Sequence, residues 1–150
     1  LKEYISLPNS SEFNLLYVSH NESSHSDRVG TNSIFANKEW AIVDKQRVEY
    51  RDFLSRLKKS KFMLCPRGNA IDCHRNWEVL YMKRVPVMKR YPYLETLFKN
   101  YPVLFVNDYS EVTEELLVSN DNLYQQAQLM NQEELILSNF YNRIVSNNLV

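Results

Sequence analysis

Charged side chains of both signs are concentrated in residues 66–78, which read Pro-Arg-Gly-Asn-Ala-Ile-Asp-Cys-His-Arg-Asn-Trp-Glu. Arg67 precedes the loop glycine Gly68, and Arg75 follows in the first turn of an expected helix. Guanidinium groups bind phosphate oxygens through paired hydrogen bonds, and the free N–H groups of a helix start add a positive dipole end. The segment therefore predicts a site for a diphosphate.

Asp72 is expected to be the N-cap of the helix that begins at Cys73, because a carboxylate there accepts hydrogen bonds from the first free N–H groups. His74 and Glu78 are four residues apart and therefore project along one face of this helix. A carboxylate one turn inside the helix is poorly placed to touch the phosphate, but it can accept hydrogen bonds from a ribose diol. We interpret Glu78 as the residue that binds the sugar of a nucleotide. The apolar face expected against the sheet carries Trp77, Leu80 and Tyr81.

Two further residues complete the candidate site: Asn69, in the same loop as Gly68, and Lys89, just past the next expected strand. All of these residues also have purely structural interpretations. Asp72 can serve only as a helix cap, and the two residues on the polar helix face can form an exposed i,i+4 pair. Lys83 and Arg84 can likewise be solvated charges at the end of the helix.

The candidate residues need a sheet edge that brings them together, and the pattern along the chain predicts one. Short apolar runs alternate with helical stretches, which is typical of a parallel sheet wrapped by helices. Strands are expected at 14–19, 40–43, 62–65, 85–88 and 103–106. Helices are expected at 33–36, 47–59, 73–83 and 93–98 and from about 111 to the C-terminus, with Leu137, Phe140, Tyr141 and Ile144 in the last apolar stripe. We predict an α/β, Rossmann-like parallel sheet with helices on both faces, the 62–65 strand near its centre and ligands at the strands' carboxyl ends.

Composition narrows the class of protein. The 150 residues are enough for one domain, and 18 lysines and arginines balance 18 aspartates and glutamates. A chain without net charge lacks the basic field that binds nucleic acid or anionic lipid, and no apolar run approaches the ~20 residues of a membrane span. We therefore expect no nucleic-acid partner and no membrane span. Because the first residue is Leu1, we also expect that the chain is a piece of a longer protein.

Glycine, histidine and cysteine exclude several kinds of chemistry. Gly30 and Gly68 are too few for the dinucleotide fingerprint, the phosphate-binding loop and the nucleophile elbow of serine hydrolases. The three histidines lack zinc-binding spacing, so no metal site is predicted. Cys65 and Cys73 are too few for a disulfide scaffold; they favour a reducing compartment and leave one local disulfide between them open.

The segment from Cys65 to Met82, followed by Val-Pro-Val-Met at 85–88, resembles the nucleotide-sugar-binding half of exostosin-like glycosyltransferases. These enzymes have the two-domain GT-B architecture. The resemblance extends over roughly residues 14–118, with a specific central motif and supportive flanks. It implies that 1–150 is a single donor-binding domain and that the acceptor-binding domain is absent. Many family members have Gly-Cys before the Pro-Val strand, where this chain has Lys83 and Arg84.

For the site, the resemblance implies that Arg67 and Arg75 contact the diphosphate or the transferred sugar and that Glu78 binds the ribose. Asp72 and His74 would face the sugar. The implied enzyme is a glycosyltransferase that needs no metal or cofactor and transfers a sugar, with inversion, from a UDP-sugar or a GDP-sugar to a hydroxyl of a glycan or another acceptor. The arginines and the helix dipole would stabilise the departing nucleoside diphosphate. The catalytic base is expected in the absent domain.

Two functions from other classes remain open. A non-catalytic module of the same fold would bind a nucleoside diphosphate without turnover, whereas a response-regulator-like or other interaction domain would not bind it. Localisation is also open between the cytoplasm and, where an upstream anchor has been removed, the Golgi lumen.

Overall fold

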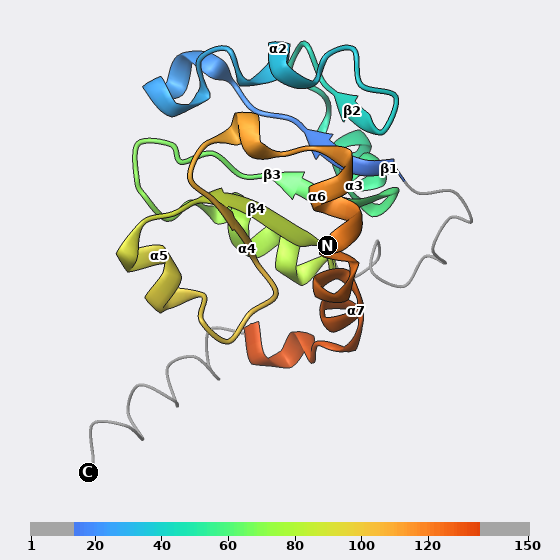
Figure 1. Cartoon of the computed structure of the whole chain (residues 1–150), viewed down its shortest axis with the longest axis vertical. Coiled ribbons are helices and arrows are strands. Elements are labelled where there is room, and N and C mark those ends of the chain that lie inside the picture. Colours follow the sequence, from blue (N-terminus) through green and yellow to red (C-terminus); the bar gives the residue numbers. More distant parts are fainter. Residues whose placement is uncertain (1–13, 136–150) are drawn as a thin grey trace.

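A five-stranded parallel sheet forms the centre of the computed structural model, which describes residues 14–135 (Figure 1). The strands are β1 (Asn14–Val18), β2 (Ala41–Val43), β3 (Ser60–Leu64), β4 (Val85–Lys89) and β5 (Leu104–Val106). Their spatial order is β2-β1-β3-β4-β5, and every neighbouring pair is parallel. The prediction of an α/β, Rossmann-like parallel sheet with the third strand at its centre is confirmed.

Helices connect the strands. They are α2 (Thr31–Phe35), α3 (Tyr50–Lys58), α4 (His74–Tyr81), α5 (Pro92–Leu97), α6 (Glu114–Ser119) and α7 (Asp121–Leu129). Short 3-10 turns are η1 (Glu22–Ser24), η2 (Ser26–Arg28), η3 (Tyr109–Glu111) and η4 (Gln132–Leu135). None of the described helices is long and apolar enough to cross a membrane. The expected helix from 111 onward is divided into η3, α6, α7 and η4, and its last apolar residues, Leu137, Phe140, Tyr141 and Ile144, lie outside the described residues.

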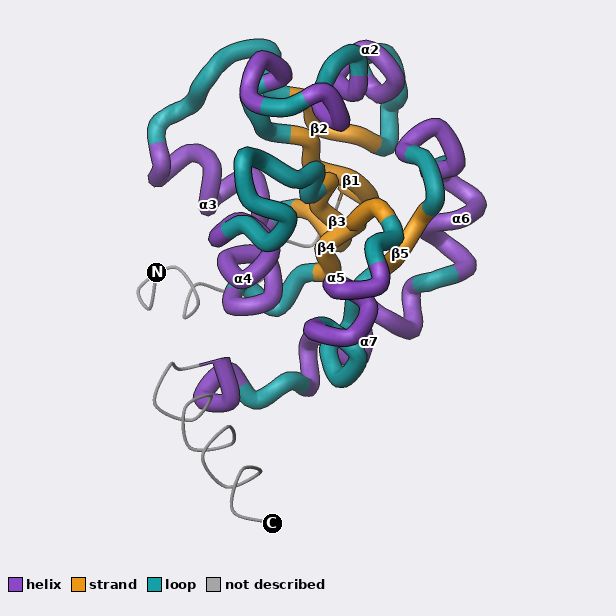
Figure 2. Tube along the Cα trace, turned by 90° about the vertical axis from the view of Figure 1, so that its left-hand side faces the viewer, coloured by secondary structure: helices purple, strands orange, loops and turns teal. Residues whose placement is uncertain are grey.

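Side chains alternate across the sheet, so each face has its own core. Along β3, Phe62 and Leu64 face one core and Met63 faces the other. The first core lies beneath α2, α6 and α7 and includes Phe35, Leu117, Tyr124 and Ala127. The second lies beneath α3, α4 and α5 and includes Phe53, Leu54, Leu57, Val79, Leu80 and Leu94. Figure 2 shows the strands between the two helical layers, with α3 and α4 on one side and α6 on the other. The expected helices on both faces are therefore present.

The buried face of α4 is rotated from the expected one. Its buried residues are Asn76, Val79 and Leu80. Trp77 is only partly buried, and its ring packs against Phe98 with the ring centroids 4.7 Å apart. Of the expected sheet-facing stripe, Leu80 is buried and Trp77 packs against the same core, whereas Tyr81 does not belong to it. The polar Asn76 instead takes a buried position that a search for apolar periodicity does not assign to the core.

The end of α4 explains the unusual Lys-Arg pair before β4. Lys83 adopts a left-handed conformation (φ 57°), and its N–H donates to the Leu80 carbonyl (2.9 Å), while the Arg84 N–H donates to the Val79 carbonyl (3.0 Å). This is a Schellman motif, with Lys83 at the position that usually holds glycine. Arg84 is 1% exposed, and its guanidinium donates to the carbonyls of Lys58 (2.7 Å) and Lys83 (2.9 Å). The interpretation of Arg84 as a solvated charge is therefore wrong.

Candidate functional site

A cleft of about 910 Å³ opens at the carboxyl edge of the sheet, beside the ends of β1 and β3. These two strands are neighbours, but the chain continues from β1 to β2 on one side and from β3 to β4 on the other. The helices that follow the two strands therefore lie on opposite faces of the sheet, and a crevice is left between the connections. Open α/β sheets bind their ligands at this point, in pockets of roughly 300–1,000 Å³.

Three segments form the walls of the cleft, beside Leu64 and Pro66 at the end of β3, and we name each wall by the elements that carry it. The β1–α2 wall consists of 19–23, Arg28 and Asn32. The β2–α3 wall consists of 45–48, Tyr50 and Phe53. The α4 wall consists of Cys73, His74, Arg75 and Glu78. The cleft residues include four cationic side chains (Arg28, Lys45, Arg47 and Arg75) and two anionic ones (Glu22 and Glu78), a balance that favours an anionic ligand.

Arg75 and Glu78 lie side by side on the α4 wall. Arg75 Nε is 3.3 Å from Glu78 Oε2, and the Arg75 guanidinium lies over the Phe53 ring, 3.9 Å from its centroid. Arg75 Nη1 is buried and has no hydrogen-bond partner. The Tyr50 hydroxyl donates to Glu78 Oε1 (3.1 Å), and burial together with the Glu78 charge raises the pKa of Tyr50 to about 12. The wall therefore keeps a donor of Arg75 available for a ligand beside a carboxylate held in place by α3.

His20 is held in a defined tautomer on the opposite β1–α2 wall. Its Nε2 lies 2.6 Å from Thr31 Oγ1, and the Thr31 hydroxyl donates to the Arg28 carbonyl (2.7 Å). Because that proton is used, His20 Nε2 must be the donor to Thr31, which leaves Nδ1 as an acceptor. Nδ1 is buried and has no hydrogen-bond partner. Burial and the charges of Arg28 and Arg75 lower the pKa of His20 to about 4, so the ring is neutral at pH 7.

Arg28 joins the β1–α2 wall to the loop after β3. Its Nε donates to the Arg67 carbonyl (2.8 Å) and its Nη2 to the Pro66 carbonyl (3.1 Å). A Cβ at Gly68 would lie 3.2 Å from Arg28 Nη2, so the missing side chain makes room for this guanidinium. The space left at Gly68 is therefore filled by a side chain of the protein itself.

The structure brings some of the expected site residues together and separates others. His74, Arg75 and Glu78 line the cleft. Arg67, Gly68, Asn69, Asp72 and Lys89 do not line it. Arg67 carries its guanidinium over the Tyr91 ring, 5.9 Å from the centroid, so the two arginines do not converge on one point as predicted.

The prediction that Asp72 caps α4 is wrong. The helix begins at His74, its N-cap is Cys73 in an extended conformation, and no side chain caps it. The Asp72 carboxylate instead accepts hydrogen bonds from Asn76 Nδ2 (3.2 Å) and Trp77 Nε1 (3.1 Å). The helix starts one residue later than expected, and this shift moves Asp72 out of the capping position and over side chains of the first turn.

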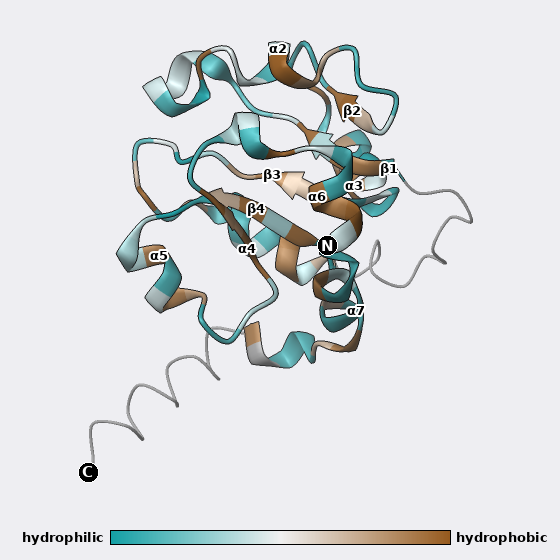
Figure 3. Cartoon of the chain, viewed as in Figure 1, coloured by the Kyte–Doolittle hydropathy of each residue, from teal (hydrophilic) through white to brown (hydrophobic). Residues whose placement is uncertain are grey.

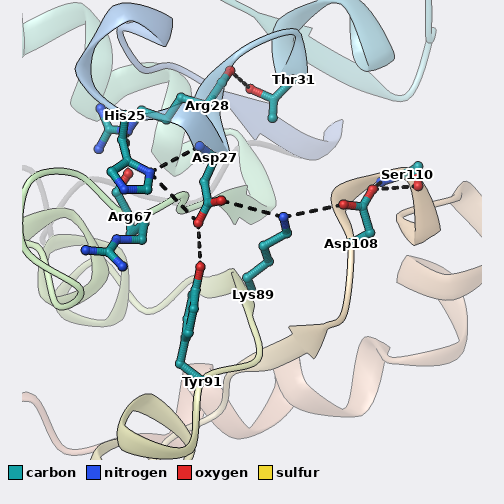
Figure 4. A network of polar contacts seen from close by, with 9 residues as sticks. All are labelled: His25, Asp27, Arg28, Thr31, Arg67, Lys89, Tyr91, Asp108 and Ser110. Carbon is teal, nitrogen blue, oxygen red and sulfur yellow. Dashed lines mark hydrogen bonds and ion pairs between the residues drawn. The ribbon is translucent and has the colours of Figure 1, made fainter.

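Lys89 belongs to a polar network beyond the cleft (Figure 4). Its Nζ lies 3.7 Å from Asp27 Oδ1 and 3.4 Å from Asp108 Oδ2, so two carboxylates already balance its charge. The Tyr91 hydroxyl donates to Asp27 Oδ2 (2.5 Å). The network ties η2 to the carboxyl ends of β4 and β5. It therefore anchors the segment of residues 20–30, which is mostly hydrophilic (Figure 3) and supplies most of one wall of the cleft.

We expect Tyr91→Phe to loosen this anchor. Loss of one side-chain hydrogen bond to a carboxylate should lower the free energy of unfolding by about 1 kcal/mol and raise amide hydrogen exchange in 25–29. Tyr93→Phe is the matched control, because Tyr93 is 56% exposed. Equal exchange in 25–29 for the two variants would show that Tyr91 does not anchor the segment.

Both cysteines are free; Cys65 is buried, which raises the pKa of its thiol, and Cys73 lies on the α4 wall. Within residues 14–135, no group of three or more His, Cys, Asp and Glu side chains is arranged to hold a metal ion. Sequence reasoning missed His20, Arg28 and Tyr50 as cleft residues. For His20 the available signal was its position, directly beyond the end of an apolar strand, where parallel sheets bind ligands.

A comparison with protein-family models found no match for this chain, and a comparison with curated proteins found none either. The fold and the cleft define the class: a Rossmann-like α/β domain with a cleft at the point where its strand order reverses.

Proposed function

We propose that the cleft binds a nucleotide-sugar donor and that the chain is the donor-binding domain of a glycosyltransferase. The observation that carries this proposal is Arg75 Nη1, a buried cationic donor without a hydrogen-bond partner, next to Glu78 in a cleft where positive side chains outnumber negative ones. The resemblance of residues 65–88 to exostosin-like glycosyltransferases supports the same function.

The diphosphate would lie between Arg75 and Arg28, near the start of α4. Both arginines line the cleft, and α4 begins without a side-chain cap, so its first N–H groups are not taken by a capping side chain. Free N–H groups at a helix start and guanidinium donors together stabilise a phosphate. Arg67 is not assigned to the phosphate, because its side chain lies outside the cleft.

The ribose would bind to Glu78. Its carboxylate lies one turn inside α4, at the depth at which a ribose follows a phosphate held at the helix start. Tyr50 and Arg75 hold the carboxylate from two sides, so its orientation is set before the ligand binds. A preorganised acceptor of this kind binds a diol with little loss of side-chain entropy.

In the reaction, a hydroxyl of the acceptor attacks the anomeric carbon from the face opposite the nucleotide. The bond from this carbon to the diphosphate breaks, the new glycosidic bond forms, and the hydroxyl proton passes to a base supplied by the acceptor-binding domain. Arg75, Arg28 and the start of α4 stabilise the charge that develops on the departing diphosphate. A non-catalytic module of the same fold would keep the binding step and lose the transfer.

Calorimetric titration with UDP, GDP and inorganic pyrophosphate, without added metal, tests the proposal. We expect one nucleoside diphosphate to bind at least tenfold more tightly than pyrophosphate, because only it reaches Glu78. Absence of binding by all three would overturn the proposal and favour an interaction domain. Hydrolysis of a UDP-sugar or a GDP-sugar by the chain alone would contradict the assignment of the base to another domain.

Glu78→Ala should weaken binding at the ribose part of the nucleotide site and leave the phosphate part intact. We expect the affinity for the nucleoside diphosphate to fall by about 1–3 kcal/mol, as for loss of a charge-assisted hydrogen bond, with the fold retained. Pyrophosphate should bind no more weakly than before, because the substitution also releases Arg75 from its ion pair. Glu95→Ala, which removes an exposed carboxylate paired with Arg90, is the control. An equal loss for both ligands would place Glu78 at the phosphate instead of the ribose.

A further inference from the structure

Two walls of the cleft keep buried polar atoms that have no hydrogen-bond partner. On the α4 wall these atoms are a donor, Arg75 Nη1, and an acceptor, Glu78 Oε2, whereas on the β1–α2 wall both of them, His20 Nδ1 and Asn32 Oδ1, are acceptors. Buried polar atoms in native proteins are nearly always hydrogen-bonded, and an exception calls for an explanation such as a functional role. Because both of these atoms are acceptors, the β1–α2 wall favours a ligand that brings hydrogen-bond donors.

The acceptor character of His20 Nδ1 is set by the protein. The Thr31 hydroxyl accepts a hydrogen bond from Nε2–H and donates one to the Arg28 carbonyl, so the neutral ring carries its proton on Nε2 and cannot present an N–H at Nδ1. Arg28 and Arg75, the cations near the ring, oppose its protonation. The backbone of Asn32 is held separately, because its N–H donates to Glu22 Oε1 (2.8 Å), and its side-chain oxygen has no hydrogen-bond partner. The β1–α2 wall thus carries one acceptor whose protonation state the protein sets, His20 Nδ1, and the unpartnered side-chain oxygen of Asn32.

A diphosphate cannot satisfy these atoms, because its ionised oxygens only accept hydrogen bonds. Hydroxyl groups donate, and a sugar carries several of them on a rigid ring. We infer that the β1–α2 wall is the subsite for the transferred sugar of the nucleotide donor, with His20 Nδ1 and Asn32 Oδ1 accepting hydrogen bonds from its hydroxyls. This inference rests on the proposed function and makes His20 a residue that determines the specificity for the donor sugar.

Two substitutions at His20 test its two interactions separately: the hydrogen bond of Nε2 to Thr31 and the acceptor at Nδ1. Gln places an amide N–H near the position of Nε2, so His20→Gln keeps the donor to Thr31 and loses the acceptor at Nδ1. Asn places its amide oxygen near the position of Nδ1, so His20→Asn keeps the acceptor and loses the link to Thr31. If His20 only supported the wall through Thr31, the Asn variant would be the more damaged of the two.

The experiment compares the affinity of a nucleoside diphosphate with that of its sugar conjugates. The probes are UDP with UDP-glucose, UDP-galactose, UDP-N-acetylglucosamine, UDP-xylose and UDP-glucuronate, and GDP with GDP-mannose and GDP-fucose. We expect at least one conjugate to bind the unmodified chain more tightly than its parent nucleotide, since the sugar adds hydrogen bonds. His20→Gln should remove most of this gain, roughly tenfold, and His20→Asn should retain more of it.

Failure of this inference is distinguishable from failure of the proposed function. If UDP or GDP binds but no conjugate binds more tightly than its parent, or if His20→Gln keeps the gain and His20→Asn loses it, the sugar subsite is overturned and the nucleotide site stands. If neither nucleotide binds, the proposed function fails, and the sugar subsite fails with it.

Discussion

Replacing Arg84 by methionine is expected to lower the free energy of unfolding by about 3 kcal/mol, because the substitution removes hydrogen bonds from a charged donor to buried acceptors. The guanidinium donates to the Lys58 carbonyl at the end of α3 and to the Met82 and Lys83 carbonyls after α4. Carbonyls at helix ends have no partner within their own helix. Arg84 therefore caps two helices at once, and methionine of similar length would bury those carbonyls without a donor.

Urea unfolding of the two proteins measures this effect. Arg90→Met is the control, because Arg90 is exposed and its ion pair with Glu95 is also on the surface, where such pairs contribute about 0–1 kcal/mol. We expect Arg90→Met to change the free energy of unfolding by well under half of the Arg84 effect. Equal stability of Arg84→Met and the unmodified chain would show that the guanidinium does not hold the two helix ends together.

Acid is expected to destabilise the domain through His20. In the folded chain the pKa of His20 is lowered to about 4, first by burial and then by Arg28 and Arg75. In the unfolded chain His20 has an ordinary pKa of about 6.5. Between about pH 4 and pH 6.5, His20 is therefore protonated in the unfolded chain and neutral in the folded chain. Stability is therefore unaffected by this group above about pH 6.5 and falls as the pH is lowered, by about 3 kcal/mol in total near pH 4.

His20→Gln isolates this contribution. Carboxylates whose pKa is lowered in the folded chain, such as Asp121, also reduce the stability of the protein in acid. This reduction is the same in the variant and in the unmodified chain. The difference in free energy of unfolding between the variant and the unmodified chain, measured at pH 7, 5 and 4, therefore reports His20. We expect the variant to gain relative stability as the pH falls. A difference that stays constant with pH would show that His20 titrates normally.

The order of strands and helices could be predicted because each is marked by a pattern of neighbouring residues in the sequence. Apolar runs of four or five residues, such as Phe62–Cys65, mark strands buried on both faces, and Phe53, Leu54 and Leu57 mark one face of a helix. All five strands of residues 14–135 were expected, with bounds that differ by no more than two residues from those observed. Alternation of strands and helices then left a parallel sheet with its ligand cleft at the carboxyl edge as the consistent arrangement.

The α4 wall was predictable for the same reason, whereas the β1–α2 wall was not. His74, Arg75 and Glu78 share one helical face, so their spacing alone brings them together. Arg28 reaches the Arg67 carbonyl across 39 residues of sequence, and His20 is set by a hydrogen bond to Thr31 in a segment without apolar periodicity. Contacts between loops leave no pattern in a single sequence.

The errors at Asp72, Asn76 and Arg84 have a common physical cause. Each is a polar residue whose place depends on the partners that the fold brings to it: two side-chain donors for Asp72, a carboxylate for Asn76 and the ends of two helices for Arg84. Hydrophobic periodicity assigns such residues to the surface or to a cap, because it records the transfer of a side chain out of water and not its hydrogen bonds. The amino-acid pattern decided the layers of this protein and one wall of its cleft, and the tertiary structure decided which polar groups are buried, which are paired and which are left for a ligand.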